Sequence, residues 1–470
     1  MPITTTAQPR PPGQLTSPGQ MPPDNRGRSG LRGVVGLARA GVRTVVRSWT
    51  TTPGRLTLIA TGLVILTLLT GLTAAVMAQQ KTDAVSELTN RREPLTAAAG
   101  QVYRALSDAD ATASSSFLST GDEPPALRVR FINDIAQAGV FLARAASDPE
   151  AGPEISRQID IIGEYLPIYA ELVGTARANN QQGFPAGAAY LREASQLMQS
   201  TILPAAEALY EADTRALADR QAEARGFPWL TALLVTGLLA ALIATQLYLK
   251  RRTKRVFNIG LVVATAAIVV GVLWSSAALI TQSVLISSSE TNGSEQVDRL
   301  VRARIAGLKA RVDETLLLVS RGEGQQYAEE FTRMSEEMAG KDGRGGLLAE
   351  ARAAAEGHDA LAATLDKAQE HAAAWLKAHA KVRDLDDEGE YLEAASVAID
   401  DTREDSSARA FNKLDIELNT AIQHGRQNFF DDASDAGAAL TLLPWGWIVL
   451  GFVAAGGVAV GIQERLREYR

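Results

Sequence analysis

Four long apolar stretches constrain this 470-residue chain more than any other feature of its sequence. Residues 56–80, 226–249, 256–289 and 436–463 contain no Asp, Glu, Lys, Arg or His. Each stretch exceeds the roughly 20 residues that a helix needs to cross the hydrocarbon core of a bilayer. Because a backbone in hydrocarbon must satisfy its own hydrogen bonds, stretches of this kind form helices. The sequence therefore predicts an all-α membrane protein with four transmembrane helices and two extracytoplasmic helical-bundle domains.

Charge is distributed unevenly between the segments that these stretches separate. Eight Arg and one Asp precede the first stretch, and "KRRTKR" at residues 250–255 places five basic residues between the second and third. Residues 81–225 carry 13 basic and 20 acidic side chains, and residues 290–435 carry 18 and 31. Since Lys and Arg collect on cytoplasmic flanks, we expect a multi-pass protein of the cell membrane with both termini and the 250–255 loop in the cytoplasm.

The expected organisation repeats one layout, in which a long helical segment lies between two membrane helices. In chain order the expected parts are a disordered cytoplasmic tail (1–30), a basic amphipathic juxtamembrane segment (31–55), transmembrane helix 1 (56–80), an extracytoplasmic four-helix bundle (81–225), transmembrane helix 2 (226–249), a cytoplasmic loop (250–255), transmembrane helix 3 (256–281), a second extracytoplasmic helical domain (282–436), transmembrane helix 4 (437–462) and a cytoplasmic tail (463–470).

Helical periodicity and chain breakers support this division. Apolar residues recur at steps of three and four, the pattern of a helical bundle, at Leu95, Ala99, Val102, Leu106, Ala109 and Ala113 and again at Val301, Ile305, Leu308, Val312, Thr315 and Val319. Breakers at 119–126, 147–153 and 179–187 divide the first segment into four helices. Breakers at 321–324, 340–346, 386–390 and 400–407 divide the second, which we expect to be less regular and to hold one short extra helix.

Motifs that carry chemistry are missing from the sequence. It has no GxxxxGK[ST] loop, GxGxxG motif after a strand, HExxH motif, GxSxG elbow or cysteine. Its histidines include no pair at i, i+4 spacing, and we expect them, His379 among them, on solvated helix surfaces. The membrane stretches hold no ionisable residue, which disfavours transport. We therefore expect no enzymatic activity, no cofactor, no metal site and no nucleic-acid partner.

One polar stretch in the first long segment is the candidate for partner binding. Ser107, Asp108, Asp110 and Thr112 lie near the end of its first helix that is farthest from the membrane. Such side chains could contact a protein partner or a polar ligand. Small polar residues also permit tight helix packing and capping, so both interpretations stay open.

The basic flanks and the last apolar stretch also allow two interpretations each. The cytoplasmic basic residues are Arg43, Arg47, Lys250, Arg251, Arg252, Lys254 and Arg255. Residues 31–49 either form an amphipathic helix on the inner leaflet, in contact with membrane lipids, or only set the topology. The 250–255 loop anchors the topology and is a candidate docking site. A GxxxG pattern at Gly457 and Gly461 either packs against another helix or arises by chance.

Two stretches and the overall layout carry a family resemblance. "YRALSDADATASSSFLSTGDEPPALR" at 103–128, "AWLKAHAKVRDLDDEGEYLEAASVAI" at 374–399 and the four-helix, two-ectodomain layout resemble the actinobacterial GlnX family. The resemblance implies a non-enzymatic signal relay for amino-acid sensing. Its partners would be an extracytoplasmic glutamate/aspartate-binding lipoprotein and a cytosolic Ser/Thr protein kinase that controls 2-oxoglutarate metabolism. The alternatives are a direct small-solute sensor with chemoreceptor-like ectodomains and a structural envelope or assembly factor, and a homo-oligomer fits any of the three.

Overall fold

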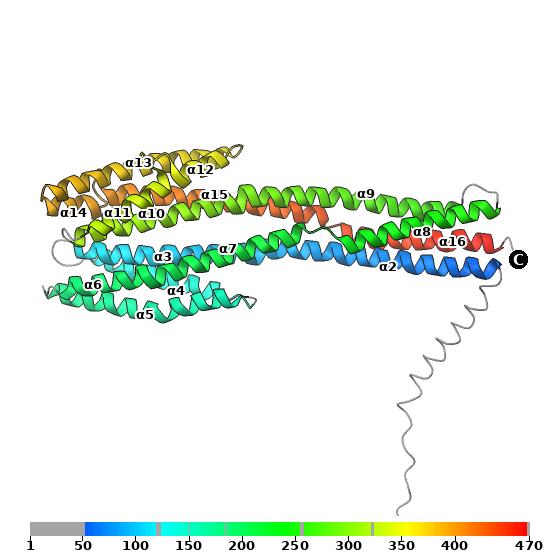
Figure 1. The fold of residues 1–470 in the computed structure, drawn as a ribbon, viewed down its shortest axis with the longest axis horizontal. Helices are drawn as coiled ribbons and strands as arrows, with labels where there is room; N and C mark the ends of the chain where they lie inside the picture. Colours follow the sequence, from blue (N-terminus) through cyan, green and yellow to red (C-terminus); the bar gives the residue numbers. More distant parts are fainter. Residues whose placement is uncertain are drawn as a thin grey trace, which may run out of the picture.

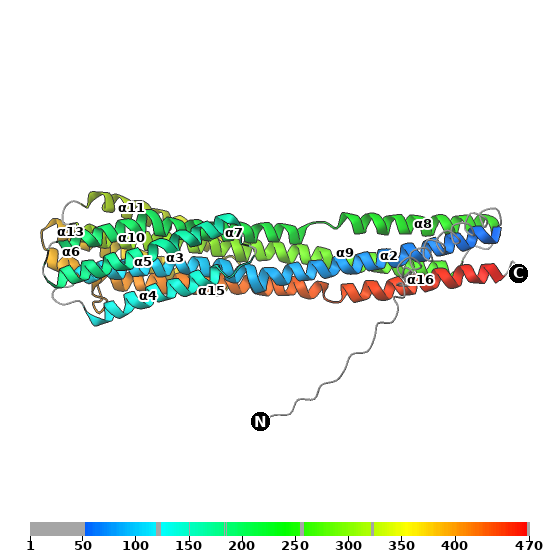
Figure 2. The same cartoon turned by 90° about the horizontal axis from the view of Figure 1, so that it is seen from below.

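The computed structural model describes residues 52–118, 124–149, 151–182, 184, 186–253, 258–320 and 324–467. These residues form helices and turns, and no β-strand occurs among them. The helices run close to parallel along one axis, so the molecule is a long rod with its apolar helices at one end and its other helices at the opposite end (Figures 1 and 2). The expected tail at 1–30 and nearly all of the juxtamembrane segment at 31–55 lie outside the described residues.

Four helices of this rod are long and apolar enough to cross a membrane, which confirms the predicted all-α membrane fold. They contain α2 (Thr52–Glu87), α8 (Trp229–Thr253), α9 (Ile259–Ser288) and α16 (Leu443–Arg467). Within this group α16 packs against both α2 and α9, and α8 packs mainly on α2. Each of these four helices is joined to a further helix, so the helical segment extends well past its apolar part. The first such segment runs for 65 residues from Gly54 to Leu118.

The GxxxG pattern in the last stretch brings two membrane helices into backbone contact. A Cβ atom placed on Gly260 would lie 2.3 Å from the carbonyl oxygen of Gly457 and 2.6 Å from Cα of Gly461. The Asn258 side chain also donates a 2.7 Å hydrogen bond from Nδ2 to the carbonyl oxygen of Gly461. No side chain fits between α9 and α16 at this point, so the packing interpretation of the pattern is correct.

The first bundle follows α2 directly and has four helices. Its elements are η1 (Leu88–Arg92), α3 (Glu93–Leu118), α4 (Pro125–Ala145), α5 (Pro153–Gln181), α6 (Ala186–Leu197), η2 (Met198–Ile202) and α7 (Leu203–Arg225), where η denotes a π-helical turn and α6, η2 and α7 form one helix. Helix α4 packs along α3, α5 along α6, and α7 along both α3 and α5. The helix ends coincide with the breakers, and Pro125 and Pro153 stand at helix starts, where a missing N–H costs nothing.

The second bundle follows α9 and is less regular. Its elements are η3 (Ser289–Ser294), α10 (Glu295–Val319), α11 (Gln325–Ala339), α12 (Gly346–Ala354), α13 (Asp359–Asp387), α14 (Tyr391–Ile399) and α15 (Ser407–Leu440). Two short helices, α12 and α14, replace the single one expected. The chain also turns at residues 355–358, where Gly357 adopts a φ of 87° that favours glycine.

The two bundles share one hydrophobic core. Buried apolar residues from both form a single contiguous cluster, because α3 packs along α10. Five of the six periodic residues predicted in α3 are fully buried, and the sixth, Leu95, is 7% exposed. The pairing of the two bundles through the helices that leave the membrane was not predicted from the sequence.

The connections between bundles and membrane helices are of two kinds. Helix α2 continues into α3 through η1, and α9 continues into α10 through η3. The returning helices are interrupted, at residues 226–228 before α8 and at 441–442 before α16. Lys81 of α2 bridges the first interruption, because its Nζ donates hydrogen bonds to the carbonyl oxygens of Ala224 and Gly226, both at 2.6 Å. A cation at a helix C-terminus also interacts favourably with the helix dipole.

Candidate functional site

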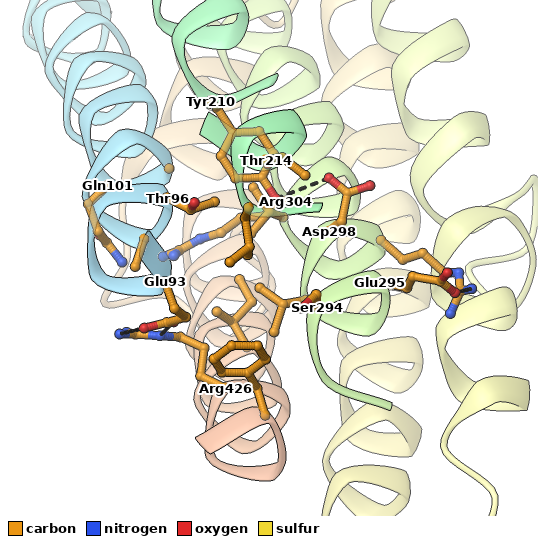
Figure 3. A pocket seen from close by; sticks show the side chains of 18 of the residues that line it. Glu93, Thr96, Gln101, Tyr210, Thr214, Ser294, Glu295, Asp298, Arg304 and Arg426 are labelled. Carbon is orange, nitrogen blue, oxygen red and sulfur yellow. Dashed lines mark hydrogen bonds and ion pairs between the residues drawn. The ribbon is translucent and has the colours of Figure 1, made fainter. Parts of the chain in front are cut away.

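A cavity of about 310 Å³ lies between the two bundles. Its wall consists of α3, α7, η3 with α10, and α15, whose side chains converge on it in Figure 3. These segments are the ones joined in sequence to α2, α8, α9 and α16. Every residue that lines the cavity in the described part of the chain therefore belongs to a helix that leads to the membrane portion.

A glycine on α3 keeps part of this space open. A Cβ atom on Gly100 would lie 3.6 Å from the Tyr210 ring and 3.8 Å from Cγ1 of Val301, which are ordinary van der Waals distances. Glycine destabilises a helix interior by roughly 0.5–1 kcal/mol relative to alanine. The backbone geometry here does not require glycine, so its effect at this position is to leave room between α3, α7 and α10.

An ion pair joins the bundles at one side of the cavity. The Arg426 guanidinium on α15 contacts both carboxylate oxygens of Glu93 on α3, with Nη2 3.2 Å from Oε2. Glu93 is only 6% exposed, so the pair is shielded from solvent on its acidic side. A bidentate arginine–carboxylate pair sets both distance and orientation, and here it ties the start of the first bundle to the second.

A second polar link crosses the cavity between α7 and α10. The Tyr210 hydroxyl donates a 3.1 Å hydrogen bond to Oδ1 of Asp298 (Figure 3), and Nε of Arg302 donates to Oδ2 of the same carboxylate at 2.9 Å. Burial, together with the nearby Asp298 charge, holds the pKa of Tyr210 well above its usual range. The phenol therefore keeps its proton at physiological pH and remains a donor.

The other links between the bundles near the cavity are single contacts. Lys309 pairs with Glu207 at 2.8 Å, and Gln221 Nε2 donates to Ser294 Oγ at 2.8 Å. Partly exposed ion pairs of this kind contribute about 0–1 kcal/mol each. The bundles are thus held together by the apolar core that α3 and α10 share, by the Glu93–Arg426 pair and by weaker polar links around the cavity.

Three of the four predicted partner-binding residues lie inside the first bundle. Asp110 is fully buried and accepts hydrogen bonds from Ser195 Oγ at 2.8 Å and from the Tyr169 hydroxyl at 3.2 Å. Ser107 and Thr112 are 1% and 4% exposed. Burial raises the pKa of Asp110 to about 6, while its two hydrogen-bond donors oppose that rise. This placement favours the packing interpretation for Ser107 and Asp110.

Asp108 has a different environment from its neighbours. Its Oδ2 accepts a 2.7 Å contact from Nη1 of Arg104 one helical turn earlier. Burial and then the nearby Asp415 charge raise the pKa of Asp108, and Arg104 opposes them. Together with Thr112 it lines a crevice of about 510 Å³ between the bundles, at the end far from the membrane helices. Two of the four predicted residues thus reach the space between the bundles, and Ser107 and Asp110 do not.

The predicted basic flank is described only in part. Lys250 and Arg251 are exposed on the last turns of α8, and Arg252 belongs to the same helix. Arg43, Arg47, Lys254 and Arg255 lie outside the described residues.

The prediction that His379 lies on a solvated surface is wrong. Its side chain is only 12% exposed, stacks on Phe331 with ring centroids 3.5 Å apart, and places Nδ1 3.0 Å from Oε1 of Glu314. Glu314 also accepts a hydrogen bond from Ser407 Oγ at 2.6 Å and pairs with Arg311. Burial alone would raise the pKa of Glu314, but the Arg311 charge and these hydrogen bonds lower it to about 2.

Sequence reasoning missed this cluster because its members come from helices that are far apart in the chain. Glu314 and His379 are separated by 65 positions, and Glu314 and Ser407 by 93. The periodicity of α10 gave no hint of it, because Glu314 lies on the side opposite the predicted apolar face and is buried only because α10 is enclosed on nearly all sides. Within the described residues, no group of three or more His, Cys, Asp or Glu side chains is arranged to hold a metal ion.

Comparison with known proteins adds one finding. Residues 84–222, which span most of the first bundle, match the family model described as an actinobacterial sensor domain. No curated protein and no solved structure is significantly similar to the chain. The match and the four apolar helices together support a sensing or signalling role for this membrane protein.

Proposed function

We propose that the protein is a non-enzymatic transmembrane signal relay whose input changes how the two bundles sit on each other. The observation that carries this proposal is the wall of the inter-bundle cavity, which consists of the four helices leading to the membrane portion. A stimulus that shifts one bundle against the other must displace these helices. Because α3 and α10 continue into α2 and α9 through η1 and η3, these two helices carry the displacement to the membrane end of the rod.

The energies involved are modest. A signal of this kind requires a coupling free energy of typically 1–3 kcal/mol between the two ends. A ligand or partner can move the equilibrium only by the difference in its affinity for the two states. Weak polar links around the cavity suit this range, because rearranging one or two of them changes the energy by a similar amount.

The proposed sidedness places both bundles outside the cell and both termini and the 250–255 loop inside. The chain contains no cysteine, so single introduced cysteines report their side without background. In intact cells a membrane-impermeant maleimide should label Arg157→Cys, which is exposed on α5, and should label Lys250→Cys only after lysis. The reverse pattern would place the bundles in the cytoplasm and end the proposal.

The proposed partners follow from the resemblance to the GlnX family. Input would come from an extracytoplasmic glutamate/aspartate-binding lipoprotein that docks on the bundles, and output would pass through the basic inner flanks to a cytosolic Ser/Thr protein kinase. Cross-linking the tagged full-length protein in its native cells, followed by solubilisation and purification, should recover both. Recovery of neither would remove the partners from the proposal and leave the relay itself untouched.

The relay itself is tested by locking the two bundles together. A reducible bifunctional thiol cross-linker that spans the length of the replaced ion pair joins Glu207→Cys to Lys309→Cys between the bundles and, as a control, Arg352→Cys to Asp366→Cys within the second bundle. In nanodiscs, the inter-bundle cross-link should change the rate at which trypsin cleaves the basic 250–255 loop, and reduction should restore it. Equal rates for the locked, control and reduced proteins would refute the coupling.

A second candidate function is direct sensing of a small solute, without a docked protein. The cavity favours it, because its volume lies at the lower end of the range typical of ligand pockets, about 300–1,000 Å³. Solute binding to the purified full-length protein, measured by calorimetry, would separate this function from one that needs the lipoprotein.

A further inference from the structure

A polar groove adjoins the inter-bundle cavity. It has a volume of about 580 Å³ and lies between α3 and α4 of the first bundle and α10 and α15 of the second. Four arginines line it, namely Arg104, Arg144, Arg304 and Arg426, with Asp415 as the one acidic lining residue in the described chain. This concentration of positive charge stands out in a region of the sequence where acidic residues outnumber basic ones.

The groove and the cavity share a wall. Arg104, Arg304 and Arg426 line both spaces, so these three side chains form the boundary between the groove and the cavity. Figure 3 shows Arg304 and Arg426 among the side chains that line the cavity. Beyond this boundary the cavity is lined largely by apolar side chains, including Leu217, Val301 and Leu308.

Three of the four arginines are held by carboxylates of the protein. Arg104 pairs with Asp108 at 2.7 Å, Arg304 with Asp415 at 2.6 Å, and Arg426 with Glu93. The pairs orient the guanidinium groups and balance their charges.

Arg144 differs from the other three. It is exposed on the last turn of α4 and makes no ion pair within the described part of the chain. The groove therefore keeps one positive charge that its own carboxylates do not balance, and Nη1 of Arg426 makes no hydrogen bond with described residues. These two groups are free to bind an added anion.

We propose that groove and cavity together bind a small organic carboxylate with an apolar tail. Arginine presents its N–H groups in a planar fork that matches a carboxylate. The acid head would lie in the groove between Arg144 and Arg426, and the tail would extend past the arginine wall into the apolar cavity. An inorganic anion would use only the groove and would gain nothing from the cavity.

Binding in this position has a structural consequence. A ligand carboxylate that binds the free Nη1 of Arg426 with one oxygen can reach Nη2 with the other, and Glu93 now holds Nη2 in the pair that ties α3 to α15. Exchange of the partner on Arg426 would loosen that tie and let the bundles shift. The ligand class deepens the proposed relay. The effect of the ligand on signalling rests on that proposal, whereas its binding does not.

The binding test uses full-length protein in nanodiscs and three probes with the same six-carbon chain, namely hexanoate, hexanol and hexylammonium. Hexanoate should bind saturably by calorimetry, and hexanol and hexylammonium should not. Benzoate, a bulkier carboxylate, should also bind saturably, and empty nanodiscs correct for partitioning into lipid. Inorganic phosphate should bind more weakly than hexanoate. Absence of saturable binding of both carboxylates, or equal binding of hexanol, would overturn the proposal.

Two substitutions locate the site. Arg144→Ala removes a charge that holds no other residue, and it should weaken hexanoate binding about tenfold or more, as expected for a charge-assisted hydrogen bond. The matched control is Arg192→Ala, an equally exposed arginine on α6. Equal affinities of the two variants would exclude the groove.

The second substitution fills the cavity. Gly100→Leu places a side chain among Tyr210 and Val301, so it should abolish the preference for hexanoate over phosphate, whereas Gly139→Leu, which faces open space on α4, should not. If Gly100→Leu still prefers hexanoate, the tail does not enter the cavity.

The two proposals fail in different ways. Carboxylate binding without any change in tryptic cleavage of the 250–255 loop would count against the relay. Absence of carboxylate binding in a protein whose loop cleavage still responds to the inter-bundle cross-link would count against this site alone.

Discussion

Replacement of Asp110 by asparagine tests whether the buried carboxyl of α3 serves packing and costs stability when it ionises. Asp110 is fully buried, and burial raises its pKa from 3.8 to about 6. Its hydrogen-bond donors, Ser195 and Tyr169, can donate equally well to the amide oxygen of asparagine. Asp110→Asn therefore keeps one oxygen as acceptor and removes the ionisation, while an NH2 group replaces the second carboxyl oxygen.

The sign and size of the effect follow from linkage. Between pH 4 and pH 6 the folded protein keeps the proton on Asp110 while the unfolded chain loses it, so the stability of the wild type falls as pH rises through this window. Above it the cost stays constant. A rise of about 2 pKa units corresponds to about 3 kcal/mol, at 1.36 kcal/mol per unit. The stability of the variant relative to the wild type should therefore increase by about 3 kcal/mol between pH 4 and pH 8.

Thermal unfolding of the full-length protein in nanodiscs, followed by intrinsic fluorescence between pH 4 and pH 8, measures this difference. For a folded unit of about 150–250 residues, 3 kcal/mol corresponds to a rise in Tm of roughly 6–12 °C. Asp160→Asn, on an exposed face of α5, controls for the loss of one negative charge. A gain from Asp110→Asn that is the same at pH 4 and pH 8 would refute burial as the cause of the raised pKa.

Three further substitutions have outcomes that the structure predicts. Lys81→Met removes the ammonium donor from the carbonyl oxygens of Ala224 and Gly226, of which Ala224 keeps a 3.3 Å hydrogen bond from Gln282, and should cost about 1–3 kcal/mol, seen as faster proteolysis at residues 226–228 than in Lys81→Arg. Glu314→Gln leaves Arg311 buried without its carboxylate and should lower the free energy of unfolding by about 3–5 kcal/mol at pH 7. Because the pKa of Glu314 is lowered to about 2, that difference should persist down to about pH 4.5 and shrink as pH falls towards 2, and a constant difference would contradict it. Gly260→Val forces α9 away from α16, where a Cβ atom would lie 2.3 Å from a backbone oxygen, and should lower the Tm more than Gly237→Val on α8, which faces open space.

The linked arrangement of bundles and membrane helices explains why a protein without a recognisable catalytic motif can still carry a signal. Its long helices span both ends of the rod, and the cavity between the bundles lies where all four of them meet. In the proposed relay, a small change in that space would reach the segments that lead to all four membrane helices.

Local sequence patterns were sufficient to determine the fold class, the four membrane helices and the faces of α3 and α10 that enter the core. The length of an uncharged stretch and a spacing of three to four between apolar residues are properties of a single segment. Their preference for lipid or for a buried helix face does not depend on the rest of the chain. The breakers determined most helix ends for the same reason, since proline and glycine act on their own backbone.

Tertiary structure alone decided which polar residues meet. Glu93 and Arg426 are 333 positions apart, and nothing in either segment indicates that they form a pair. The burial of Asp110, the contact between His379 and Glu314, and the cavity itself all depend on how α3 and α10 pack, which brings two segments of distant sequence into one core. Periodicity states which face of a helix is buried, but the partner of that face is determined by packing over the whole molecule, where side-chain shape and hydrogen bonding are satisfied together.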